Sequence, residues 1–235
     1  MKRGVTLIEL IFVIVVIGIL SAVIAPSFTR PTLSEAANQL VSHIRYTQHL
    51  AMVDNKFDPN NQFWYRQRWQ LKFQAKKIDG QDRVLYTIFN DRPSVVGGII
   101  YNGNASTVVN NNEIAKNPLN PSQLLTGLSS SSQTNSKEMI LNEKYGIEKV
   151  EFSTSCNRYS SNRIIFDYLG RPLFGNSSTY TTAYRNDNDT TRKLRLIQGQ
   201  CIIKLCLDKP CRSGIENFIR IAIEPETGYT HVLPN

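Results

Sequence analysis

The N-terminal part of the chain is a long apolar run. Between residues 10 and 24 the only polar side chain is Ser21, and the wider stretch 5–28 adds only a few more. A helix rises about 1.5 Å per residue, so about two dozen residues can cross a hydrocarbon core of about 30 Å. Lys2 and Arg3 precede the run and would keep the N-terminus on the cytoplasmic side. The pattern therefore predicts a membrane-spanning helix over residues 5–28.

Apolar residues return with helical spacing after Pro26. They follow the i, i+3, i+4, i+7 pattern of one helix face over residues 29–54, at Leu33, Ala36, Ala37, Leu40, Val41, Ile44, Tyr46, Leu50 and Ala51. Because proline bends or breaks a helix, the first helix could simply end at Pro26. The resumed periodicity instead favours one long helix from about Val5 to Val53, bent at Pro26 and amphipathic in its second half.

Residues 55–235 alternate between short strand patterns and turn signals. Apolar and polar residues alternate within 63–75, and Asp79-Gly80 predicts a hairpin turn to a returning strand over 83–90. Further strands are expected at 95–101, 147–154, 163–168, 200–207, 218–223 and 229–233, with a turn at 225–228. The predicted fold class is α+β, with the long helix packed on an antiparallel β-sheet domain.

A segment at about 102–137 differs from its surroundings in composition. It is rich in Asn, Ser, Thr and Gln and holds few large apolar residues. A segment of this kind buries little surface, so a flexible insertion is expected. A tolerated insertion is favoured over a surface that faces a partner.

A carboxylate, Glu9, lies within the apolar run, where a charge is costly unless it is paired. One alternative is a cleaved secretory signal peptide, for which the small residues within 21–25 could imitate the cleavage site. A second alternative is a plain signal anchor, but it leaves Glu9 unexplained. An acidic side chain at this depth therefore calls for a positively charged partner.

The run from Gly4 to Leu10, Gly-Val-Thr-Leu-Ile-Glu-Leu, resembles the processing signature of type IV prepilins and type II secretion pseudopilins. The resemblance implies that a prepilin peptidase cuts between Gly4 and Val5 and methylates the new amine. It also implies that Glu9 pairs with the Val5 amine of a neighbouring subunit, since two buried charges are tolerable as a pair. Pro26 stands where the family has it, whereas at position 5 a Phe or Met is more usual.

Two C-terminal patterns, at residues 166–172 and 221–232, are similar to minor pseudopilins of the H class. The resemblance implies a leader of residues 1–4, an inner-membrane anchor, a pilin fold and a periplasmic C-terminal domain. The implied function is that of a minor pseudopilin in a type II secretion system, which supports protein export. The implied partners are a prepilin peptidase, other pseudopilins or pilins, the inner-membrane assembly platform and membrane lipid.

The alternative function is that of a minor pilin in a type IV pilus, concerned with adhesion or DNA uptake. The net charge is +8, or about +6 without residues 1–4. Basic residues cluster at Arg192, Lys193, Arg195, Lys204, Lys209 and Arg212. Because such clusters are more often solvated surfaces than nucleic-acid sites, nucleic acid is not the expected partner.

The four cysteines all lie in the C-terminal third. An even number in an exported domain favours disulfides. Zinc is the alternative for Cys201, Cys206 and Cys211, although neither a CxxC nor an HxxxH pair occurs. Among the three possible pairings we expect Cys206 with Cys211 and Cys156 with Cys201, because both loops are short enough to close.

The sequence holds no constellation typical of catalysis. His43, His49 and His231 lack a nearby nucleophile motif, so packing or surface positions are expected for them. The stretch 186–189, Asn-Asp-Asn-Asp, offers oxygen ligands but lacks the spacing of an EF-hand loop, which favours a solvated turn over a calcium site. We therefore expect a protein that is not an enzyme and uses neither a cofactor nor a metal.

Overall fold

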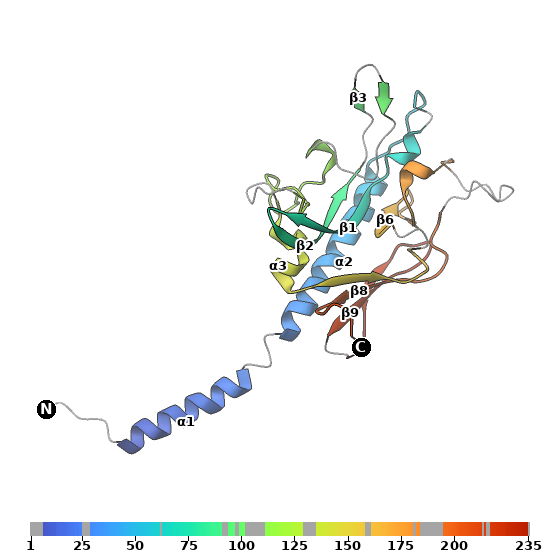
Figure 1. Ribbon diagram of the computed structural model, residues 1–235. Helices are drawn as coiled ribbons and strands as arrows, with labels where there is room; N and C mark the ends of the chain where they lie inside the picture. The colour runs from blue at the N-terminus through green and yellow to red at the C-terminus, as the bar shows by residue number, and fades with distance from the viewer. Residues whose placement is uncertain are drawn as a thin grey trace.

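Two α-helices begin the part of the chain that the computed structural model describes. Helix α1 covers Leu7–Ile24 and α2 covers Thr29–Val53. α2 lies along the β-rich body, and α1 extends away from it (Figure 1). The described residues are 7–24, 29–61, 63–90, 94–96, 99–101, 111–128, 135–157, 161–180, 182–183, 195–212, 214 and 217–234.

One face of α2 is the helical contribution to the core. The apolar stripe expected from the sequence is buried at Leu33, Ala36, Ala37, Leu40, Val41, Ile44 and Ala51, and the partly buried Tyr46 and Leu50 pack against it. The amphipathic second half of the predicted helix is thus confirmed. Whether the two halves form one helix bent at Pro26 stays a prediction, because residues 25–28 lie outside the described residues.

Within the described residues, most strands form two four-stranded antiparallel sheets where one sheet was expected. The first sheet has the order β2-β1-β6-β7 and the second β10-β9-β8-β5. The strands are β1 Gln70–Ile78, β2 Gln81–Phe89, β5 Lys149–Phe152, β6 Arg163–Phe166, β7 Pro172–Leu173, β8 Cys201–Cys206, β9 Phe218–Ile223 and β10 Thr230–Leu233. With the helices, they confirm the α+β class.

Local turn chemistry explains the hairpin between β1 and β2. Asp79 and Gly80 have φ angles of 52° and 81°, the left-handed conformation that a two-residue hairpin turn requires. Two expectations nearby need correction. Residues 64–66 form a short 3-10 helix, η2 (Trp64–Arg66), so the strand begins later, at Gln70. The single strand predicted over 95–101 is instead an antiparallel pair, β3 (Ser94–Val96) and β4 (Ile99–Tyr101).

The described part of the predicted insertion is packed rather than flexible. Its segment 111–128 begins with a short helix, η3 (Asn111–Glu113), and lies along β2, where the Ala115 amide donates to the Ile88 carbonyl at 2.9 Å. The Ile88 amide donates in turn to the Leu125 carbonyl at 3.0 Å, and Leu125 is fully buried. Backbone hydrogen bonds to the edge of β2 and the burial of a few apolar residues order this segment, although its composition is polar. A short helical turn, η4 (Lys137–Met139), and α3 (Leu141–Tyr145) follow.

The C-terminal half of α2 fastens both sheets at their turns. Gln48 Nε2 donates to the Gly170 carbonyl, in the turn between β6 and β7, at 2.8 Å. The same nitrogen donates to the Thr227 carbonyl, in the turn between β9 and β10, at 2.7 Å. Arg45 Nη2 donates to the Thr230 carbonyl at 2.7 Å. A helix residue that bonds one turn of each sheet fixes the sheets relative to each other.

His43 is a buried part of the contact between α2 and β2. Its Nδ1 lies 2.7 Å from Tyr86 Oη, and its Nε2 lies 2.9 Å from Gln39 Nε2. Burial lowers the pKa of His43 from 6.5 to about 4. The ring is therefore neutral at pH 7, which fits the packing position expected for it.

We expect the His43 environment to make stability depend on pH. Between pH 6.5 and 4 the unfolded state binds more protons than the folded state, because the pKa of His43 is higher in the unfolded state. The stability that the neutral His43 ring provides is therefore fully present above pH 6.5 and is lost as the pH falls toward 4. The loss is about 3 kcal/mol. Urea unfolding should show that His43→Gln flattens the dependence between pH 7.5 and 4.5. An unchanged slope in the variant would contradict a buried neutral ring.

Candidate functional site

The N-terminal helix is the first candidate site, and it is defined by exposed apolar surface. Leu7 and Ile8 are 78% and 75% exposed. The other large apolar side chains along the helix are exposed to a smaller extent, between 37% and 70%: Leu10, Ile11, Phe12, Val13, Ile14, Val15, Val16, Ile17, Ile19 and Leu20. A helix that is apolar around its circumference normally lies inside a larger protein assembly or a membrane.

Glu9 lies in the first turn of α1, where the helix dipole favours a negative charge. The other predicted residues of this segment, Gly4, Val5 and Pro26, lie outside the described residues. The ends of the predicted span, 5–6 and 25–28, lie there as well. Among the helices described, none combines the length and the apolarity needed to cross a membrane.

The four cysteines form two disulfides. Cys156 is bonded to Cys201 and Cys206 to Cys211, which is the pairing expected from the sequence. Glu151 lies close to the second disulfide, and its carboxylate with the two sulfurs would be a plausible metal set only if those sulfurs were free thiolates. The disulfides leave no free cysteine, so this structure is not compatible with the zinc alternative.

The basic cluster considered for nucleic acid is divided over different parts of the fold. Arg192 and Lys193 lie outside the described residues, as does the stretch 186–189 considered for calcium. Arg195 lies beside the first sheet, where its Nη1 donates to Thr179 Oγ1 at 2.8 Å. Lys204 belongs to β8 of the second sheet, and its Nζ lies 4.0 Å from the centroid of the Phe218 ring.

The last two members of the cluster each face a carboxylate. Lys209 Nζ lies 3.8 Å from a Glu148 oxygen, and Arg212 Nε lies 3.9 Å from an Asp208 oxygen. These pairs are exposed, so each contributes little to stability. The described members of the cluster thus each have a different partner.

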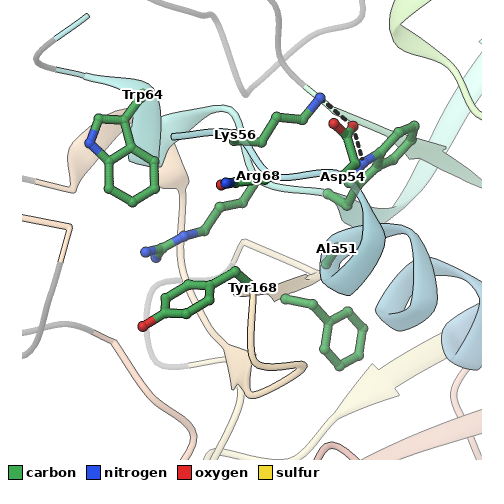
Figure 2. A pocket seen from close by; sticks show the side chains of 9 residues that line it. Ala51, Asp54, Lys56, Trp64, Arg68 and Tyr168 are labelled. Atoms are coloured by element: carbon green, nitrogen blue, oxygen red, sulfur yellow. Dashed lines mark hydrogen bonds and ion pairs between the residues drawn. The ribbon is translucent and has the colours of Figure 1, made fainter. Parts of the chain in front are cut away.

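A small cavity lies where the end of α2 meets β1 (Figure 2). Asp54, just past α2, accepts a hydrogen bond from Trp69 Nε1 at 2.8 Å and pairs with Lys56. The Arg68 side chain is buried, and its Nη2 donates to the Ala183 carbonyl at 2.8 Å. Burial lowers the pKa of Arg68.

The size of this cavity decides its role. It measures about 20 Å³, which is room for about one water molecule and too little for an organic substrate. Among the described residues, Arg68 Nη1 is buried and has no hydrogen-bond partner. The aromatic and charged residues here attach the end of α2 to the first sheet.

Comparison with known proteins gives one match, in the N-terminal segment. Residues 1–25 match the family model described as the prokaryotic N-terminal methylation motif. This supports a type IV pilin-like protein. The class includes pseudopilins, and its motif implies processing by a prepilin peptidase and assembly with other pilins. None of the curated proteins matches, and none of the solved structures does.

Proposed function

We propose that the chain is a minor pseudopilin of a type II secretion system, resembling those of the H class, and a structural subunit rather than an enzyme. The observation that carries the proposal is the methylation motif, followed by a helix whose large apolar side chains are exposed. In this function the helix anchors the subunit in the inner membrane, and residues 55–235 form a periplasmic domain. The two disulfides support an exported domain, because disulfides persist in oxidising compartments.

The mechanism is assembly. After loss of residues 1–4, apolar helices of neighbouring subunits pack laterally, and the Glu9 carboxylate of one subunit pairs with the Val5 amine of another. Each charge compensates the desolvation of the other inside the filament. α2 then connects this packed region to the domain, because Gln48 fixes one turn of each sheet.

The alternative is a minor pilin of a type IV pilus, which the methylation motif supports equally. Its DNA-uptake form needs basic residues that converge on one surface. The described members of the cluster lie on β8, on the loop after it and beside β7, and Arg192 and Lys193 lie outside the described residues.

The proposal is tested by Glu9→Gln in the native host. The variant keeps the shape of the side chain and removes its charge, so we expect normal membrane insertion and normal cleavage after Gly4. Incorporation into filaments should fall by about tenfold or more, since the Val5 amine then loses its partner. Intact-mass analysis reports cleavage and methylation, and immunoblots of isolated filaments report incorporation.

Glu9→Asp is the matched control, because it keeps the charge and should retain part of the assembly. Normal incorporation of the Gln variant would contradict the pairing of Glu9 with Val5. A wild-type chain that is cut near residue 25, instead of after Gly4, would contradict the proposed function altogether.

A further inference from the structure

A groove lies between the two sheets and is lined by strand edges from both. Its cavity measures about 360 Å³, within the range of pockets that hold ligands. Gln74 and Ala75 of β1 line one side. Val150 of β5 lines the other, and Lys209 follows from the loop closed by the Cys206–Cys211 disulfide.

Among the described residues, the edge of β1 that faces this groove has no partner strand over its second half. β1 pairs with β2 along its whole length but with β6 only over Gln70–Lys72. The Phe73 amide donates to the Asn162 carbonyl at 2.8 Å. Because successive residues of an antiparallel strand direct their backbone groups to opposite sides, those of Ala75 and Lys77 point away from β2. Within the described residues, no strand pairs with them.

The edge of β5 is open in the same way. β5 is the edge strand of its sheet and pairs with β8. The Ser153 amide donates to the Ile202 carbonyl at 2.9 Å, so by alternation the backbone groups of Val150 point away from β8. The rings of Phe73 and Phe152 meet edge to face, with centroids 5.3 Å apart, and join the two edges at one end of the groove.

Gln74 adds an acceptor that the described chain leaves unused. Its Oε1 is buried and has no hydrogen-bond partner, although the residue lines the groove. Buried carbonyl oxygens of this kind are normally bonded. An extended backbone in the groove would bring an N–H donor to the Gln74 oxygen. Its other N–H and C=O groups would pair with the backbone groups of Ala75 and Val150.

The charge of the rim favours an acidic occupant. Lys149 and Lys209 line the groove, and Lys76 and Lys77 are exposed on the open part of β1. Glu148 lines the groove as well and lies 3.8 Å from Lys209, and Glu151 of β5 lies 2.7 Å from Lys149. The chain as a whole carries +8, so a second copy would be repelled where an acidic segment is attracted.

We propose that this groove binds one extended, acidic segment of a partner protein by strand addition between β1 and β5. Backbone hydrogen bonds to the two open edges supply the affinity, and the lysines select for negative charge. Lysines on an open strand edge can also serve to prevent aggregation. The experiment must therefore distinguish peptide recognition by these lysines from protection of the edge against aggregation. The inference does not depend on the proposed secretion function, and its test uses purified protein.

The probe is an acetylated and amidated heptapeptide, Glu-Val-Glu-Val-Thr-Val-Glu, added to the full chain in detergent micelles. We expect binding in calorimetry and amide hydrogen exchange slowed by about tenfold or more at Ala75, Lys77 and Val150. The same peptide with Lys in place of Glu should bind about tenfold more weakly. Equal binding of both peptides, or no protection of these amides, would overturn the proposal.

Two variants locate the binding. Ala75→Pro removes an N–H that points into the groove and lies outside the β1–β2 ladder, so it should abolish binding. The Thr87 amide, which lies in that ladder opposite Lys72, should keep its slow exchange. Lys149→Glu combined with Lys209→Glu should weaken binding about fivefold or more, whereas the exposed Lys137→Glu should not. Wild-type binding by both groove variants would refute the site. Protection of the same amides by self-association without peptide would show that a second copy is the occupant.

Discussion

Gly228→Ala is expected to destabilise the domain by about 3–5 kcal/mol. Gly228 has a φ of 67°, a conformation that costs a residue with a Cβ about 1–2 kcal/mol. A Cβ there would lie 2.5 Å from the Gly170 carbonyl oxygen and 2.5 Å from Gln48 Nε2. The first neighbour is backbone of another turn, so the contact cannot be relieved by a rotamer change, and overpacking of this kind costs about 1–3 kcal/mol.

The same clash should loosen the contact between α2 and the two turns that Gln48 bonds. Displacing Gln48 weakens its bonds to the Gly170 and Thr227 carbonyls, each with a net contribution of about 1 kcal/mol. Urea unfolding of the full chain in detergent measures the total. The local signature is faster amide exchange in β10 and in the turn between β6 and β7, which Gln48 fastens from α2.

Gly80→Ala is the matched control for Gly228. Gly80 has a similar φ of 81°, but a Cβ there would meet no atom within 4 Å. It should therefore show the conformational cost alone, about 1–2 kcal/mol. Equal destabilisation by the two variants would mean that the contacts of Gln48 with the two turns do not contribute to the stability of the domain.

Elements set by local rules could be predicted from the sequence. The stripe on α2 follows from helical periodicity, and the β1–β2 hairpin follows from the preference of Asp79-Gly80 for positive φ. The N-terminal motif is local too, because its chemistry lies in seven consecutive residues. For these features the residues that determine the structure are neighbours in the chain.

Features set by distant contacts could not be predicted. The packing of 111–128 depends on hydrogen bonds to Ile88, and composition alone suggested a flexible loop. The division into two sheets depends on β6 pairing with β1, while β5, its predecessor in the chain, pairs with β8. The clamp by Gln48 joins residues more than a hundred positions apart, and a glutamine on a polar helix face carries no signal of it.

The second large effect is expected from Cys156→Ala combined with Cys201→Ala. The chain leaves the second sheet after β5, contributes β6 and β7 to the first sheet, and returns at β8. The Cys156–Cys201 disulfide joins the points of departure and return, which are 45 residues apart. Its removal frees that loop in the unfolded chain and should cost about 4 kcal/mol.

The control is Cys206→Ala combined with Cys211→Ala, which opens a loop of only 5 residues. Because the entropy of loop closure grows with the logarithm of loop length, this variant should lose only about 2 kcal/mol. Urea unfolding compares the two variants. Wild type measured in a thiol reductant loses both disulfides, so its loss should approach the sum of the two. Equal losses, or a larger loss for the short loop, would show that the 156–201 disulfide does not stabilise the passage between the sheets.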